Sequence, residues 1–66
     1  MQVVVNGTAR EVTEGATIAV LLTSLGLEQR RVAVELNETV IPKARHADTV
    51  LKPADRVEIV TFVGGG

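Results

Sequence analysis

The sequence predicts an α+β fold in which a mixed sheet of about four to five strands packs on one helix. Three observations lead to this expectation. Residues 1–12 read as a hairpin, residues 17–26 as one amphipathic helix, and residues 32–62 as further strands separated by turns. The last three residues are glycines, which lose much freedom on ordering and offer no side chain to pack. We therefore expect one domain over residues 1–62 and a flexible C-terminal tail over residues 63–66.

A β-hairpin is predicted at the N-terminus. Residues 1–5 are rich in β-branched side chains and end at Asn6-Gly7. Both residues of this dipeptide tolerate the positive φ angles that a two-residue hairpin turn requires. Residues 8–12 should return as the second strand, and Glu14-Gly15 should end the pairing.

The helix is predicted from the spacing of its apolar residues. They recur at i, i+3, i+4 and i+7, which places them on one helical face: Ile18, Leu21, Leu22 and Leu25. Thr17 is placed to cap the N-terminus, and Gly26 stands where a left-handed glycine often ends a helix. We expect the apolar face to belong to the core.

Two strands follow the helix. Residues 32–36 alternate between apolar and other side chains, which indicates a strand with one buried face. Asn37-Glu38 predicts a turn, and Val40-Ile41 reads as a short strand. Pro42 has no N–H group, so it limits this short strand to an edge of the sheet.

The rest of the chain forms one more strand. Residues 43–49 are polar and predict a loop or a helical turn, and Pro53-Ala54-Asp55 predicts a second turn. The last strand should run from Arg56 to about Phe62. This order of elements is that of the ubiquitin-like β-grasp fold, in which the first and last strands pair in parallel at the centre of the sheet. A ferredoxin-like fold would need a second full helix.

Composition excludes several classes of function. The chain has no cysteine and one histidine, so we expect no disulfide and no metal site. The net charge is −1 and Phe62 is the sole aromatic residue, so nucleic-acid binding is not expected. Neither a signal peptide nor a membrane-spanning run of ~18 apolar residues is visible, and we expect a soluble cytoplasmic protein.

Two polar positions are expected at the surface. His46 is expected on the surface. Arg30-Arg31 reads as a solvated loop or, alternatively, as a basic step that steers an acidic partner.

The last strand suggests a docking surface beside the tail. Alternation places Val57, Ile59 and Thr61 on one face and Glu58, Val60 and Phe62 on the other. If the first face meets the helix, the second lies open. The predicted partner-docking residues at the root of the tail are Val4, Val60, Phe62 and Val63. The alternative is that Phe62 folds over a sheet edge into the core.

The candidate reactive group is the C-terminal carboxylate of Gly66, carried on a thread that includes Gly64 and Gly65. An α-carboxyl group with an ordinary pKa of ~3.3–3.7 is ionised at neutral pH. An ionised carboxylate resists nucleophilic attack unless it gains a better leaving group, such as an acyl phosphate linked to AMP. The chain lacks a phosphate-binding glycine loop before a helix. We therefore expect a separate enzyme to activate Gly66, and we do not expect this chain to be an enzyme.

Particular motifs resemble the ThiS family of sulfur carriers in thiamin thiazole biosynthesis. They are Met1-Gln2-Val3 running to Asn6-Gly7, Gly15-Ala16-Thr17-Ile18 before Leu21-Leu22, Glu35-Leu36-Asn37 before Val40-Ile41-Pro42-Lys43, and Asp55-Arg56-Val57-Glu58-Ile59-Val60 before Phe62-Val63-Gly64-Gly65-Gly66. The resemblance covers essentially the whole chain, and the approach to the tail is its most specific part. His46, Lys43 and Ala54 depart from the residues that the family often has at these positions, an aromatic residue, an arginine and a glycine.

The resemblance implies a carrier without a bound cofactor. An E1-like, ThiF-like adenylyltransferase would use ATP to adenylate Gly66. Sulfur drawn from cysteine by a cysteine desulfurase would then displace AMP, leaving a thiocarboxylate for a ThiG-like thiazole synthase. Two further readings share the fold and tail: the small subunit of molybdopterin synthase, and a ubiquitin-like modifier. A plain interaction domain with an incidental tail is the last alternative.

Overall fold

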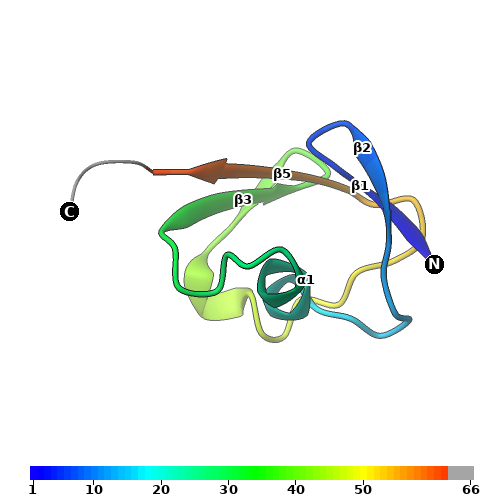
Figure 1. Cartoon of the computed structure of the whole chain (residues 1–66), viewed down its shortest axis with the longest axis horizontal. Helices are drawn as coiled ribbons and strands as arrows, with labels where there is room; N and C mark the ends of the chain where they lie inside the picture. Colours follow the sequence, from blue (N-terminus) through cyan, green and yellow to red (C-terminus); the bar gives the residue numbers. More distant parts are fainter. Residues whose placement is uncertain (63–66) are drawn as a thin grey trace.

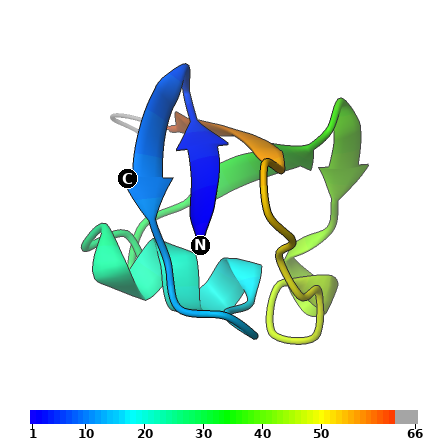
Figure 2. The same ribbon diagram turned by 90° about the vertical axis from the view of Figure 1, so that its right-hand side faces the viewer.

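A computed structural model describes residues 1–62 as a five-stranded sheet packed on one helix. The elements are β1 (Gln2–Val5), β2 (Thr8–Glu11), α1 (Ile18–Ser24), β3 (Val32–Leu36), β4 (Thr39–Ile41), a short 3₁₀ helix η1 (Lys43–Arg45) and β5 (Arg56–Thr61). The predicted tail, residues 63–66, lies outside the described residues. The ribbon shows α1 beneath one face of the sheet (Figure 1), and the turned view shows η1 on that same side (Figure 2).

The strand order is β2-β1-β5-β3-β4. The first and last strands, β1 and β5, are parallel neighbours, whereas the other neighbouring pairs are antiparallel. This is the predicted β-grasp arrangement, and β4 lies at an edge as Pro42 requires. β5 runs toward the end of the molecule opposite the N-terminus (Figure 1).

Both hairpins turn through two residues with positive φ. Asn6 and Gly7 have φ angles of 49° and 82°, and Asn37 and Glu38 have 51° and 71°. Positive φ at both positions defines the turn whose twist matches that of paired strands. Asparagine and glycine adopt this conformation readily, whereas Glu38 adopts it at a cost that the surrounding hairpin offsets.

The asparagines of these turns also bind the backbone of β5. The side chain of Asn6 donates to the carbonyl oxygen of Ile59 at 3.1 Å and accepts from its N–H at 2.7 Å. The side-chain oxygen of Asn37 accepts from the N–H of Arg56 at 2.9 Å, and its amide donates to Asp55 at 3.1 Å. β5 is thus held by one asparagine at its start and by another in its second half.

Helix α1 has the predicted ends. The hydroxyl of Thr17 accepts from the N–H of Val20 at 3.2 Å, which caps the N-terminus. Gly26 has φ of 74°, its N–H donates to Thr23 O, and the N–H of Leu27 donates to Leu22 O. These two bonds form a Schellman motif, which satisfies carbonyl groups at the helix end.

The core lies between α1 and the sheet. α1 contributes three of the four residues of its predicted face, while Leu25 is only partly buried. The buried cluster consists of Val3, Val5, Ile18, Leu21, Leu22, Val34, Leu51, Val57 and Ile59. Because consecutive strand residues face opposite ways, burial of these side chains leaves the second face of the sheet open.

Three local expectations need correction or explanation. The second strand ends at Glu11 and the last at Thr61, one residue short of the predicted ends. Ala54 has φ of 69°, a conformation that glycine adopts without steric cost, which explains physically why a glycine suits this position. His46 is not a surface residue, because its exposed fraction is 7%.

Asn6→Ala should lower the free energy of unfolding by about 2–3 kcal/mol, because it removes two hydrogen bonds to β5 and leaves alanine at positive φ. Asn6→Gly is the matched control. This variant loses the same hydrogen bonds, but glycine adopts positive φ without steric cost. Its free energy of unfolding should therefore fall by only about 1–2 kcal/mol. Urea unfolding of the three proteins measures both effects. A loss below about 0.5 kcal/mol for Asn6→Ala would show that this side chain does not hold the strand.

Candidate functional site

The end of β5 and the residue that follows it present exposed apolar side chains. Val60 and Phe62 are 58% and 59% exposed, whereas Val57 and Ile59 are 0% and 7% exposed. The predicted alternation is therefore confirmed for residues 57–60, whereas Thr61 is exposed, and the alternative that Phe62 belongs to the core is wrong. Val63, Gly64, Gly65 and Gly66, the other residues predicted for docking and reaction, lie outside the described residues.

Phe62 is held in place through its backbone. Its N–H donates to the carbonyl oxygen of Arg31 at 3.0 Å, which continues the hydrogen bonding of β5 with the chain before β3. The aromatic ring is nevertheless largely exposed. An ordered backbone that carries an exposed aromatic ring is a combination often found where a protein binds a partner, because aromatic side chains are enriched in binding surfaces.

Val4 does not join this patch. It is half-buried on the open face and lies beside Arg56, whereas Val60 lies four residues farther along β5. At ~3.3 Å per residue, this separation is about 13 Å. The apolar neighbour that the sequence analysis missed is Ala33, which is exposed and pairs with Val60. Alternation along a strand predicts only which residues share a face with Ala33, and the register with β5 is needed to place it beside Val60.

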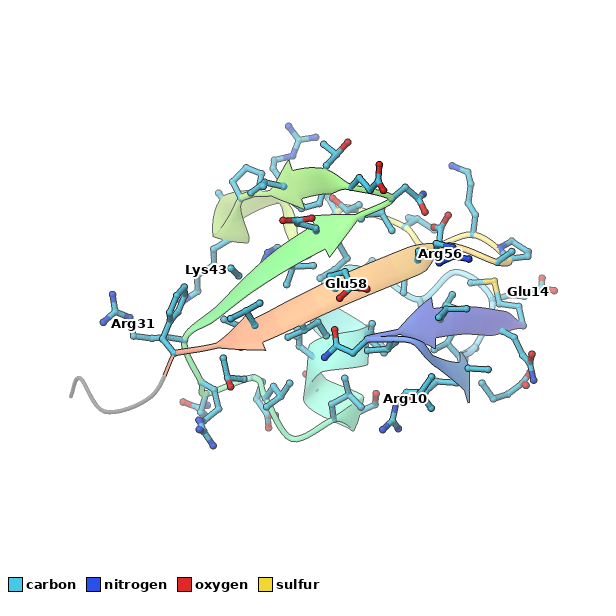
Figure 3. The ribbon with its side chains drawn as sticks, turned by 90° about the horizontal axis from the view of Figure 1, so that it is seen from above. Arg10, Glu14, Arg31, Lys43, Arg56 and Glu58 are labelled. Carbon is cyan, nitrogen blue, oxygen red and sulfur yellow. The ribbon has the colours of Figure 1, made fainter. Side chains whose placement is uncertain are left out.

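Two glutamates face each other in the middle of the open face. Glu35 of β3 and Glu58 of β5 are directly opposite in the register, and both are exposed. Figure 3, which looks onto this face, shows Glu58 at the centre of β5. Like charges directly opposite each other on a sheet destabilise it, so this pair costs stability in the isolated chain.

A basic pocket lies beside Phe62. It has a volume of about 220 Å³ and is lined by Arg30, Arg31, Val32, Lys43, His46 and Phe62. Figure 3 shows the labelled side chains of Arg31 and Lys43 near the end of β5. The loop at Arg30 and Arg31 is exposed, as expected. No pattern in the sequence indicates that Lys43, distant along the chain, lies with these two arginines.

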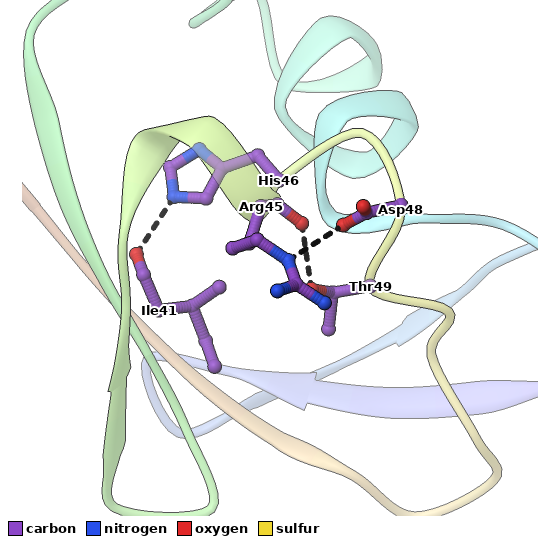
Figure 4. Close-up of polar contacts among 5 residues, drawn as sticks. All are labelled: Ile41, Arg45, His46, Asp48 and Thr49. Atoms are coloured by element: carbon purple, nitrogen blue, oxygen red, sulfur yellow. Dashed lines mark hydrogen bonds and ion pairs between the residues drawn. The ribbon is translucent and has the colours of Figure 1, made fainter.

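His46 forms part of the wall of this pocket and is fixed by a hydrogen bond. Its Nε2 lies 3.0 Å from the carbonyl oxygen of Ile41 (Figure 4). A carbonyl oxygen can only accept, so Nε2 carries the proton in this bond. The same turn is closed by the hydroxyl of Thr49, which donates to the carbonyl oxygen of Arg45 at 2.6 Å, and by the ion pair of Arg45 with Asp48. His46 therefore has a structural role.

A larger hollow of about 350 Å³ lies between the β1–β2 hairpin and the residues that follow α1. Its lining includes Leu25, Leu27 and Ile59, with Arg10 as its one charged residue. Within residues 1–62, no group of three or more His, Cys, Asp or Glu side chains is placed to hold a metal ion. In that same part of the chain, no helix is long and apolar enough to cross a membrane.

Comparison with known proteins identifies a family. Residues 3–66 match the ThiS family. The chain is 48% identical over 50 residues to the sulfur carrier protein ThiS of Bacillus subtilis, a match that covers 76% of each chain. The crystal structure of a thiamine biosynthesis protein (ThiS) from Geobacter metallireducens is similar over 100% of both chains, with a TM-score of 0.83 and 36% identity.

Some relatives are much longer than this chain. A thiazole synthase of Paramagnetospirillum magneticum is 41% identical over 66 residues, which is 100% of this chain but 20% of that protein. The chain therefore spans about a fifth of the length of this relative. A segment similar to the whole of this chain is thus present within a single polypeptide named thiazole synthase.

Ile59 of β5 and Phe62, which follows this strand, should respond differently to truncation. Ile59→Ala should lower the free energy of unfolding by about 2–5 kcal/mol, because it leaves a cavity in the core. Phe62→Ala should change it by less than about 1 kcal/mol, because most of the ring is already in solvent. Urea unfolding of both variants checks this. Equal losses would mean that Phe62 contributes to the core.

Proposed function

The chain belongs to the ThiS family, and from this membership we propose how it works as a sulfur carrier of thiamin biosynthesis. The observation that carries the assignment is the family match over residues 3–66, which includes the glycine tail as well as the fold. ThiS proteins are small sulfur carriers, so the chain is a protein on which enzymes act and is not itself a catalyst.

We propose that the terminal carboxylate of Gly66 is first adenylated by an E1-like, ThiF-like enzyme. A carboxylate oxygen attacks the α-phosphorus of ATP, an acyl–phosphate bond forms, and pyrophosphate leaves. The acyl carbon then carries AMP, a much better leaving group than oxide. The sequence has no phosphate-binding glycine loop before a helix, so the proposal assigns the activation step to a separate enzyme.

Sulfur then replaces AMP. A persulfide that carries the sulfur a cysteine desulfurase takes from cysteine attacks the acyl carbon with its terminal sulfur; a carbon–sulfur bond forms, and AMP leaves with its bonding electrons. A second thiol then attacks the sulfur–sulfur bond of the resulting acyl disulfide, releases the acyl-bound sulfur with the bonding electrons and is itself oxidised to a disulfide. The product is a thiocarboxylate on Gly66. The chain has no cysteine, so no side-chain thiol competes for the sulfur.

A ThiG-like thiazole synthase is the proposed acceptor of this sulfur. Support comes from the relatives named thiazole synthase that contain a segment similar to this chain. Covalent attachment to a carrier keeps the reactive sulfur at a high effective concentration for a docked enzyme and avoids its release as free sulfide. These steps would take place in the cytoplasm.

The surface beside the tail is the proposed docking site for these enzymes. Val60 and Phe62 supply exposed apolar area at the end of β5, and Val63 follows them in the sequence. Val4 lies on the same face but farther away, so we propose that it contacts a separate part of a partner. Gly64 and Gly65 form a thread without side chains that can pass through a narrow channel, and three residues span at most about 10 Å.

Intact-mass measurement tests the carrier function directly. The protein is incubated with the adenylating enzyme, ATP, a cysteine desulfurase and cysteine. The expected product is heavier by the mass difference between sulfur and oxygen, and fragmentation should locate the change at Gly66. A variant that lacks Gly66 is the control. An unchanged mass under these conditions would contradict the proposed function.

Gly65→Ala should preserve folding but reduce adenylation at least tenfold, because the added methyl group crowds the thread in the enzyme's channel. Pyrophosphate release measures adenylation, and thermal unfolding measures stability. Thr61→Ala is the control, since it changes an exposed side chain before the tail. Adenylation of Gly65→Ala at the normal rate would argue against a narrow channel.

A further inference from the structure

Three cationic side chains from two separate segments lie around one pocket at the end of β5. We propose that this basic pocket is a docking site for an acidic side chain on a partner protein. The inference deepens the proposed function and rests on it, since the partner is taken to be an enzyme that acts on Gly66. The docked segment would carry Asp or Glu residues and would lie beside Phe62, where the chain enters the tail.

The fold brings the members of the pocket together. Arg30 and Arg31 precede β3, Lys43 begins η1, and Phe62 follows β5. The hydrogen bond from the Phe62 N–H to the Arg31 carbonyl oxygen, at 3.0 Å, joins the loop to the strand end. The pocket is therefore built on hydrogen-bonded backbone, so a partner can bind without first ordering a loop.

The positive charge of this pocket is not neutralised within the described chain. Among residues 1–62, the ion pairs are those of the N-terminal amine with Glu11 and of Arg45 with Asp48. Arg30, Arg31 and Lys43 take part in neither. The whole chain has seven cationic and eight acidic side chains; without these three cations, four cationic and eight acidic side chains remain, a formal charge of −4. Phe62, the last residue that the structure describes, thus lies beside a positive region of an otherwise acidic protein.

The size of the pocket favours a side chain as its occupant. Its volume of about 220 Å³ is below the ~300–1,000 Å³ typical of small-molecule sites. Val32 and Phe62 provide apolar wall, and the arginines provide planar guanidinium groups that can bind a carboxylate through two parallel hydrogen bonds. A carboxylate beside apolar wall is partly shielded from water, which strengthens its attraction to the cations.

Charge at this position would act mainly on the rate of association. Complementary charges raise association rates by steering partners together, and mutation of a charge at the rim of an interface changes this rate and its dependence on salt. A positive region beside Phe62 would orient the carrier as it approaches, with this end of the molecule toward an acidic surface of the partner.

Charge reversal with a matched control tests the inference. Lys43→Glu should slow association with the adenylating enzyme about fivefold at low ionic strength. The difference should shrink in high salt, where the Debye length falls to about 3 Å. Lys52→Glu, an equivalent change at an exposed lysine outside the pocket, should alter the rate less than about twofold. Equal effects of the pocket variant and Lys52→Glu would overturn the inference, while normal sulfur transfer by the wild type would leave the proposed function standing.

A second measurement is independent of the sulfur chemistry. The ¹⁵N-labelled protein is titrated with a short peptide of Asp and Glu residues and, separately, with a Lys peptide of equal length. The acidic peptide should shift the amide resonances of Arg31, Val32, Lys43 and Phe62, and the Lys peptide should not. Inorganic phosphate at equal ionic strength is the remaining probe. The same shifts with phosphate, or acidic-peptide shifts spread over all the cationic residues, would overturn the assignment to an acidic protein segment.

Discussion

The fold depends on β5 being held in one register at the centre of the sheet. Its parallel pairing with β1 covers only two residue pairs, Val4 with Arg56 and Val5 with Val57. The register of β1 with β5 includes no further pairs. The side chain of Asn6 instead forms hydrogen bonds with both the N–H and the carbonyl oxygen of Ile59. Asn37 binds the N–H of Arg56 at the start of the strand. The two asparagines that make the turns possible therefore also fix the strand that leads to the tail.

This register determines the core and the open face together. Side chains alternate along a strand, so a shift of one residue would move Glu58 and Val60 against the helix and bring Val57 and Ile59 into solvent. The cost of burying Glu58 and exposing the valine and isoleucine excludes that arrangement. The same contacts that bury Ile59 consequently hold Val60 and Phe62 outward. The register of β5 therefore determines both the burial of the core and the exposure of the proposed docking residues.

The sequence predicted the features that depend on local chemistry. Asn6-Gly7 predicted a hairpin, Thr17 and Gly26 predicted the helix ends, and alternation predicted the faces of residues 57–60 in β5, all of which the structure confirms. The positions of His46, Val4 and Lys43 were predicted wrongly or not at all, because they depend on which distant residues meet in the fold. Burial of His46 depends on how the η1 turn folds against the rest of the chain. The separation of Val4 from Phe62 depends on the register of β1 with β5, and the meeting of Lys43 with Arg31 depends on the position of η1. Periodicity contains none of this information.

Several features that cost stability lie on the open face of the sheet and at the end of β5. Glu35 and Glu58 repel each other on the open face, Val60 and Phe62 expose apolar area, and the cations of the basic pocket have no ion-pair partner within residues 1–62. The helix side, by contrast, combines a capped helix with a continuous apolar core. Natural proteins depart from local stability rules mainly where function requires it. The distribution of these costs therefore supports an interaction surface that extends from the open face to the root of the tail, because a partner there could cover the apolar side chains and neutralise the charges.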